Sequence, residues 1–221
     1  MHSAIAENLG RIKDRIAGAC ERTGRSPAEV TLIAITKSVG VEEVQFLQSM
    51  GVTHFGENRV RSGESKIASL REGVVWHMIG NIQRRKAKAV CTLFDVIDSV
   101  DRVELAVELA RHAPGDKQPF PVLLEVNVSG EVSKHGFSQE ALLTAIDQIN
   151  AMSNLKLEGL MTMAPFHDDA ENVRPVFAAL RELANRYGLP RISMGMSNDF
   201  EVAIEEGATE VRIGTALFEG M

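Results

Sequence analysis

The sequence predicts an α/β fold, a single (β/α)8 TIM barrel with an extra N-terminal helix. Eight short apolar segments alternate with segments of helical period, and several of the apolar segments are almost continuous in Val, Ile, Leu and Met. The length of 221 residues suits one such barrel. No linker divides the chain, so we expect residues 1–221 to form one domain.

A leading helix is expected over residues 2–22, because apolar residues recur on one helical face at Ile5, Leu9, Ile12 and Ile16. The expected strands are 30–37, 53–58, 74–80, 94–100, 120–128, 157–163, 191–197 and 209–218. The expected helices between them are 41–50, 59–71, 82–91, 101–113, 138–152, 169–187 and 198–206. Three of these helices begin near residues suited to cap them, namely Asp101, Ser138 and Asp199.

A doubly wound parallel sheet is the alternative fold. It would need fewer strands than the chain offers, and no GxGxxG motif follows the first predicted strand. The barrel therefore accounts better for the pattern.

Composition argues against several classes of protein. The formal net charge of -6 disfavours nucleic acid as the main partner. Cys20 and Cys91 form no CxxC pair, so neither a disulfide framework nor a cysteine zinc site is expected. The chain shows neither a signal-peptide pattern nor an apolar stretch long enough to cross a membrane. We expect a cytoplasmic protein without a membrane partner.

Polar residues follow several predicted strands, at the barrel end where active sites form. Lys37 is the most informative, because strand alternation places it on the same face as Ile33 and Ile35. If this face points into the barrel, desolvation would favour the neutral amine, which forms Schiff bases with carbonyl compounds. The alternative is a strand-end lysine whose ammonium group reaches solvent.

The loops after the last two predicted strands are candidates for a phosphate site, which barrels often hold at this place. Gly195 and Gly214 allow close approach to the backbone, and Ser197 and Thr215 add hydroxyl donors. Both loops could instead be ordinary turns between a strand and a helix.

Arg212 shares the predicted inward face with Gly214, two residues on. A buried guanidinium needs an acceptor, which a structural salt bridge would also supply. Taken together, the lysine, the phosphate loops and the arginine match pyridoxal 5′-phosphate (PLP), which has an aldehyde, a phosphate and a pyridine nitrogen.

The sequence around these residues contains the segments AITKSV, HFGENRV, WHMIGNIQRRK, EVNVSGEVSKHGF, GLMTMAP and SMGMSNDFEVAIEEGATEVRIGTALFEG. These segments resemble the pyridoxal phosphate homeostasis protein family (the YggS/PROSC family), which is related to the N-terminal barrel domain of alanine racemase. The resemblance runs from about residue 30 to the C-terminus. It departs from the common family pattern at Asn81 and Ile82, where Pro–Leu is frequent.

The resemblance implies a site for PLP. It implies that Lys37 carries PLP as a Schiff base and that Arg212 lies near the pyridine nitrogen. The other implied contacts are to the phosphate from Ser197, Gly214 and Thr215, with Gly195 in the same loop and Asn58 lining the pocket. An arginine partner disfavours protonation of the pyridine ring, which limits carbanion chemistry.

The function that the resemblance implies is PLP binding in intracellular PLP homeostasis, without turnover and therefore not as an enzyme. The implied partners are PLP and PLP-dependent apoenzymes, and we expect a monomer. A racemase would need a second acid/base group, and the single tyrosine, Tyr187, is expected far from the strand ends. The alternatives are a weak amino-acid racemase that uses the lysine alone, and an aldolase that forms Schiff bases without cofactor.

Other polar residues receive structural interpretations. His77 is expected to be packed or hydrogen-bonded, and Lys134 and His135 to be solvated loop charges, although these two could gate the pocket. The histidines show no HxxxH or HxH spacing, so no metal site is expected. The basic run 84–88 is expected to be a solvated helix face without a nucleic-acid partner.

Overall fold

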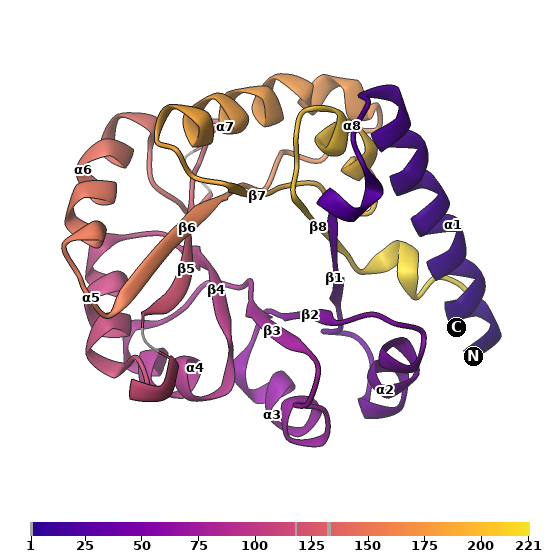
Figure 1. The fold of residues 1–221 in the computed structure, drawn as a ribbon, viewed down its shortest axis with the longest axis horizontal. Helices are drawn as coiled ribbons and strands as arrows, with labels where there is room; N and C mark the ends of the chain where they lie inside the picture. The colour runs from indigo at the N-terminus through magenta and orange to yellow at the C-terminus, as the bar shows by residue number, and fades with distance from the viewer. Residues whose placement is uncertain (1, 118, 132–133) are drawn as a thin grey trace.

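The computed structural model describes residues 2–117, 119–131 and 134–221. Eight parallel strands form a closed barrel in chain order, and helices surround it (Figure 1). The predicted (β/α)8 barrel and its leading helix are confirmed. The strands are β1 (Thr31–Ile35), β2 (His54–Glu57), β3 (Val75–Met78), β4 (Val96–Val100), β5 (Phe120–Glu125), β6 (Leu155–Met161), β7 (Arg191–Ser193) and β8 (Glu210–Ile213).

The helices follow the strands around the outside of the barrel. They are α1 (His2–Arg22), α2 (Val41–Ser49), α3 (Val60–Ser69), α4 (Ala87–Leu93), α5 (Val103–His112), α6 (Gln139–Asn150), α7 (Arg174–Arg186) and α8 (Phe200–Glu205). Two short 3-10 helices also matter for the site, η2 (Arg84–Lys86) and η5 (Thr215–Leu217).

Most strands end earlier than the sequence predicts. The segment 209–218, for example, divides into strand β8 and the 3-10 helix η5. The whole segment is apolar in sequence because Leu217, in η5, is buried in the same hydrophobic core as the strand residue Val211. The chain therefore leaves the sheet while still burying apolar side chains, and the loops that follow the strands begin sooner than expected.

The three predicted caps have different outcomes. Ser138 caps α6, and its side chain accepts a hydrogen bond from the backbone N–H of Ala141. Asp101 is not a cap, because the N-cap position of α5 is Arg102, and the Asp101 carboxylate accepts instead from Asn81 Nδ2 at 2.9 Å. Asp199 stands at the start of α8, but its carboxylate accepts from the Met196 N–H in the preceding loop, at 2.6 Å.

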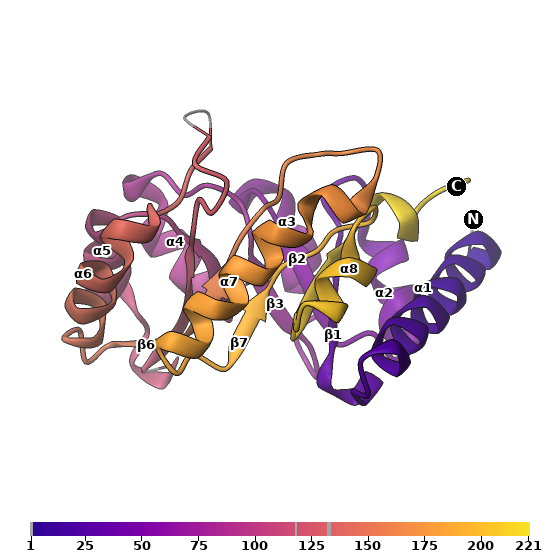
Figure 2. The ribbon, with the colours of Figure 1, turned by 90° about the horizontal axis from the view of Figure 1, so that it is seen from above.

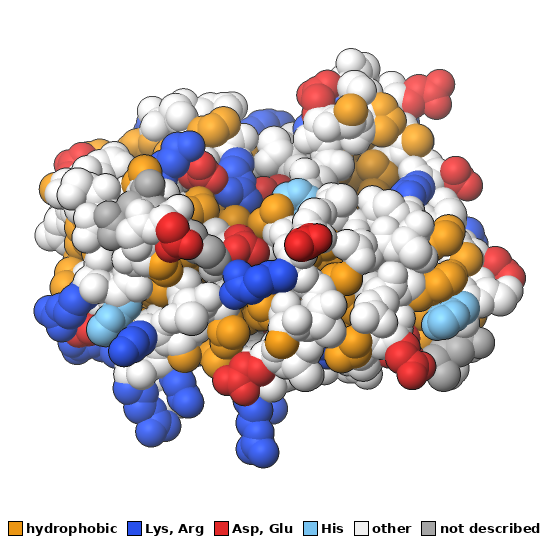
Figure 3. All heavy atoms as spheres, turned by 60° about the horizontal axis from the view of Figure 1, so that its bottom comes forward, with side chains coloured by type: hydrophobic (Ala, Val, Ile, Leu, Met, Phe, Trp, Pro, Cys, Tyr) orange, Lys and Arg blue, Asp and Glu red, His pale blue; other side chains and the backbone are white. Residues whose placement is uncertain are grey.

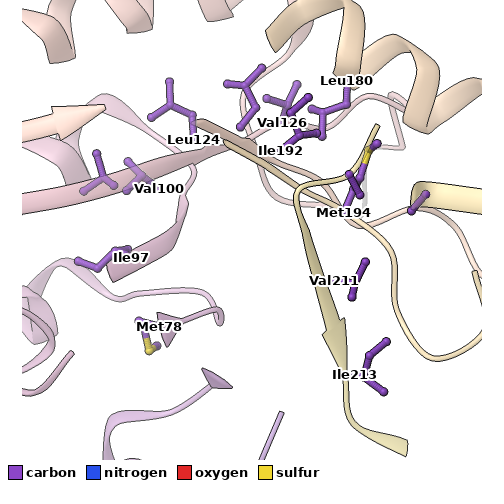
Figure 4. Close-up of a cluster of buried hydrophobic side chains, with 14 of the residues drawn as sticks. Met78, Ile97, Val100, Leu124, Val126, Leu180, Ile192, Met194, Val211 and Ile213 are labelled. Carbon is purple, nitrogen blue, oxygen red and sulfur yellow. The ribbon is translucent and has the colours of Figure 1, made fainter. Parts of the chain in front are cut away.

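The main hydrophobic core lies between the strands and the ring of helices. Figure 4 shows part of it, with side chains from several strands and from α7. Aliphatic residues dominate this core, and only 5% of the chain is aromatic. Because the outer face of every barrel strand is covered in this way, polar groups can meet only inside the barrel or at its two ends.

Helix α1 covers the seam between the first and last strands, and both chain ends lie beside it (Figures 1 and 2). Its predicted apolar face is buried, at Ile5, Leu9, Ile12 and Ile16. Asn8 donates hydrogen bonds to the carbonyl oxygens of Leu217 and Glu219, at 3.1 and 2.9 Å. Arg15 pairs with Glu201 of α8 at 2.6 Å. The leading helix is therefore an integral part of the closed barrel.

None of the helices in the described segments combines the length and the apolar character needed to cross a membrane.

Gly159 on β6 leaves no room for a side chain, and its replacement tests the barrel packing. A Cβ at this position would lie 2.1 Å from the carbonyl oxygen of Arg191, its partner on β7. We expect Gly159→Ala to lower the free energy of unfolding in urea by about 1–3 kcal/mol. Gly10→Ala is the control, since Gly10 lies inside α1 with open space around it. That change should raise stability by about 0.5–1 kcal/mol, and equal effects of both would contradict the packing argument.

Candidate functional site

The ends of the barrel strands surround a cavity of about 480 Å³. Six of the seven predicted site residues line it, namely Lys37, Asn58, Ser197, Arg212, Gly214 and Thr215. They come from the ends of β1, β2, β7 and β8 or from the loops that follow. Apolar side chains complete the wall, from Ile35, Ile79, Met163 and Met196. The cavity thus joins a few polar groups to a largely apolar lining, as small-molecule sites do.

Lys37 lies in the turn after β1, not within the strand as predicted. Its side chain lines the cavity but is exposed, so of the two interpretations the alternative, a lysine whose ammonium group reaches solvent, describes its position. The difference arises because β1 ends at Ile35 and the alternation of side chains stops there.

A buried ion pair fixes the backbone immediately before Lys37. Lys66 Nζ donates to the carbonyl oxygen of Thr36 at 2.5 Å and to Glu57 Oε1 at 2.7 Å. The Thr36 hydroxyl donates to the same carboxylate oxygen at 2.7 Å. All three side chains are buried. Residues from α3 and β2 therefore hold the turn that presents Lys37, and no local sequence pattern signals this.

Arg212 is buried on β8 and points into the barrel, as alternation predicts. Its guanidinium donates to Ser193 Oγ and to the carbonyl oxygen of Thr162, both at 2.7 Å. Among the described residues, Arg212 therefore hydrogen-bonds to neutral acceptors and does not form the structural salt bridge that the sequence left open. Two bonds leave some of its five N–H groups available to a ligand. Burial lowers the pKa of Arg212, and surrounding carboxylates, led by Asp98 and Glu125, oppose that effect.

The two predicted phosphate loops lie against each other. The Ala216 N–H donates to Ser197 Oγ at 3.2 Å, which ties the loop after β7 to η5. Gly214 lies so close to β1 that an added Cβ would come within 3.3 Å of the Ile35 Cβ. Ser197, Gly214 and Thr215 therefore line the cavity from two loops that are joined to each other.

Gly195 differs from the other six residues, because it is buried behind the loop and does not line the cavity. Its φ of +92° favours glycine, and a Cβ there would lie 2.6 Å from the Cβ of Ala203. Gly195 thus allows α8 to pack closely under the loop, while Ser197 faces the cavity.

The cavity wall also contains two titratable residues that are not among the seven predicted site residues. They are Glu125 and His135. Glu125 is buried at the end of β5, and burial together with the charge of Asp101 raises the pKa of its carboxyl group. His135 Nδ1 lies 3.8 Å from Asp101 Oδ2. Glu125 could have been predicted from the sequence, because it stands at the end of an apolar strand, where active-site residues of barrels lie.

The sequence predicts that Lys134 is a solvated loop charge, but in the structure its side chain is only partly exposed. Its ammonium group donates to the carbonyl oxygen of Met163 at 3.2 Å and pairs with Glu131 at 2.9 Å. These contacts join the loop after β5 to the loop after β6 at the edge of the cavity.

A second polar cluster lies inside the barrel, away from the cavity. His77 Nδ1 lies 3.0 Å from Asp98 Oδ1, and His77 Nε2 lies 3.0 Å from His54 Nδ1. The prediction of a hydrogen-bonded His77 is confirmed. Polar atoms of His77, Asp98 and Glu210 come within 4.8 Å of one another, an arrangement suited to a cation that residue spacing could not reveal. The Arg191 guanidinium, however, already donates a hydrogen bond to Glu210 Oε1 at 2.7 Å, so a positive charge of the protein itself neutralises this carboxylate.

Comparison with known proteins gives consistent matches over nearly the whole chain. The alanine racemase N-terminal domain family matches residues 3–221. A pyridoxal phosphate homeostasis protein of Aquifex aeolicus is 42% identical over 219 residues, with 96% of each chain covered. One of Pseudomonas aeruginosa is 41% identical, with 98% of this chain and 95% of its own covered. PipY of Synechococcus elongatus, solved with PLP bound, has a TM-score of 0.82 at 31% identity, with 97% and 99% covered.

The ion pair beneath the Lys37 turn predicts a large stability effect. Lys66→Met leaves the buried Glu57 carboxylate without its cation, so we expect the free energy of unfolding to fall by about 3–5 kcal/mol. Lys88→Met removes the same charge from an exposed position on α4 and should change stability by less than about 0.5 kcal/mol. Urea denaturation of both variants provides the comparison. A similar small loss in both would show that the pair does not anchor the turn.

His54 predicts a dependence of stability on pH. Burial and the neighbouring charges of His77 and Arg191 lower the pKa of His54 from 6.5 to about 4. Between these values the unfolded chain binds more protons than the folded one, so this residue's contribution to stability is lost as pH falls from 6.5 toward 4. The urea midpoint of the wild type should therefore fall more steeply across this range than that of His54→Gln. Parallel curves would rule out His54 as a source of the acid sensitivity.

Proposed function

Because the chain belongs to the pyridoxal phosphate homeostasis protein family, with the fold of the alanine racemase N-terminal domain, we propose that it binds PLP in the cavity around Lys37. Lys37 Nζ would hold the cofactor as a Schiff base. The observation that carries this proposal is the meeting of Lys37, Arg212 and the loops of Ser197 and Thr215 in one cavity.

The residues present fit the three functional groups of PLP. A volume of about 480 Å³ is within the range of pockets for small ligands. The hydroxyl groups of Ser197 and Thr215, with the backbone at Gly214, suit a phosphate. Arg212 retains unused donors and suits a pyridine nitrogen that accepts a hydrogen bond. The same positive charge disfavours protonation of that nitrogen, so bound PLP would serve less well as an electron sink.

We propose that the protein holds PLP for intracellular homeostasis and supplies it to PLP-dependent apoenzymes, without a turnover reaction of its own. The shared name of the Aquifex and Pseudomonas relatives supports this role. Weak amino-acid racemisation is the second candidate. Glu125 and His135 favour it, because they place two titratable groups in the cavity wall besides Lys37.

We also propose that the protein is a single-domain monomer of the cytoplasm. Large apolar side chains that are exposed lie mostly on separate elements of the described chain, which supports the proposal of a monomer. They are Met50, Val107, Leu143, Met163, Phe166 and Met221. Size-exclusion chromatography with light scattering tests the monomer directly.

Absorption spectroscopy tests the covalent link. Incubation with PLP should give the wild type a visible absorption band that disappears on borohydride reduction, with the label on Lys37 in peptide mass mapping. Lys37→Ala should lose the band completely, because no other amine would hold the aldehyde in this cavity. Lys88→Ala is the matched control and should keep it. A wild-type protein that takes up no PLP, or a label on another lysine, would contradict the proposal.

Chiral analysis distinguishes the carrier from the racemase. The PLP-loaded protein is incubated with single L-amino acids, and the D-enantiomer is measured over time. We expect no formation of D-amino acid above that caused by free PLP. Sustained formation that requires Lys37 would instead establish the enzymatic alternative.

A further inference from the structure

A second and larger cavity, of about 690 Å³, lies next to the first. It is bordered by the first turn of α3, the segment after β3, and the start of α4. Asn58, Gly80 and Asn81 line both cavities. The two spaces are therefore separated by one shared wall, and nothing in the proposed function uses the second one.

Three cationic side chains line this second cavity, Arg59, Arg61 and Lys86. All three are exposed, and among the described residues none has a side-chain hydrogen bond or ion pair to another protein group. Glu64 is the single carboxylate in the lining. The cavity thus carries an excess of two positive charges on a chain whose net charge is -6.

Several arginines close to the cavity, in contrast, do have protein partners. Arg84 bonds to Glu108 at 3.1 Å, and Arg85 bonds to the side-chain oxygen of Gln83 at 3.0 Å. Arg102 donates to the carbonyl oxygen of Ile82 at 2.8 Å. The four cationic residues of the basic run after β3 are all exposed, as predicted, and Lys86 among them faces the cavity. Figure 3 shows Lys and Arg side chains projecting along one edge of the molecule.

We infer that this second cavity binds a small molecule that carries a phosphate group. Guanidinium groups suit phosphate oxygens because they donate paired hydrogen bonds, and an ammonium group adds a point charge. A phosphate monoester carries a charge of about −1.5 to −2 at pH 7, which balances the excess in the cavity. The Gln83 amide, also in the lining, adds a neutral donor.

Nucleic acid fits this cavity less well. Binding to single strands combines cations with aromatic side chains on which bases stack, and no aromatic residue is among those that line the cavity. The overall negative charge would also repel a long polyanion. A compact ligand meets the three cations without approaching the rest of the acidic surface.

The shared wall gives such a ligand a route to influence the first cavity. Asn81 borders both cavities and donates to Asp101 at 2.9 Å. Asp101 in turn faces His135 of the first cavity. An anion that contacts Asn58 or Asn81 from the second cavity would therefore act on residues that also line the first. The binding itself does not rest on the proposed function.

Calorimetric titration with pyrophosphate tests the site. The wild type should bind pyrophosphate, and the double variant Arg61→Gln/Lys86→Gln should bind it at least about tenfold more weakly. The matched control is Arg186→Gln/Lys88→Gln, which removes the same two charges from exposed positions outside the cavity. It should bind like the wild type. Since all four replaced side chains are exposed, circular dichroism should show unchanged folding.

Three results would overturn the inference. They are the absence of pyrophosphate binding, equal weakening in both double variants, and binding that the Arg61/Lys86 changes leave intact. Succinate, a dianion without phosphate, should bind more weakly than pyrophosphate, and equal affinity would overturn the assignment to phosphate. Repeating the titration with Lys37→Ala separates the two proposals. Loss of PLP with retained pyrophosphate binding would show that the second cavity works independently of the first.

Discussion

The pairing of β1 with β8 is the interaction on which the site depends. Ile33 lies opposite Arg212, and Ala34 lies opposite Ile213, so the first and last strands of the chain are hydrogen-bonded neighbours. This closure brings Lys37 and Gly214 into one cavity although almost the whole chain separates them. Helix α1 covers the seam and is bonded to the C-terminal segment through Asn8. Closure therefore creates both the barrel and the side of the cavity where phosphate is proposed to bind.

The barrel interior divides into two polar regions with different chemistry. Toward the C-terminal end, Arg212 is held by neutral acceptors and keeps donors for a ligand. Deeper in the barrel, His77, Asp98 and Glu210 form a compact group whose members bond to other protein residues. The carboxylates of this group also lie close enough to favour the charged form of Arg212. A permanent cation can thus be kept at the floor of the cavity despite the cost of burial.

Four cationic side chains that have no side-chain hydrogen bond or ion pair among the described residues line the two cavities where ligands are proposed. Lys37 faces the first cavity, while Arg59, Arg61 and Lys86 face the second. Most arginines elsewhere in the described segments have carboxylate or carbonyl partners, as Arg174 does with three glutamates. A positively charged side chain without a protein partner remains free to bind an anion, so the distribution of partners, more than the number of charges, marks these two spaces.

The sequence by itself determined the barrel, the leading helix and the order of the strands whose C-terminal loops carry the site, because hydrophobic periodicity and strand alternation are local properties. It also predicted that Arg212 faces inward. Tertiary structure alone decided that Lys37 is exposed, that Gly195 lies behind its loop, and that Lys66 and Glu57 anchor the turn before Lys37. These features depend on where each strand ends and on which strands meet when the barrel closes. Such distances join residues far apart in the chain, and no local pattern contains them.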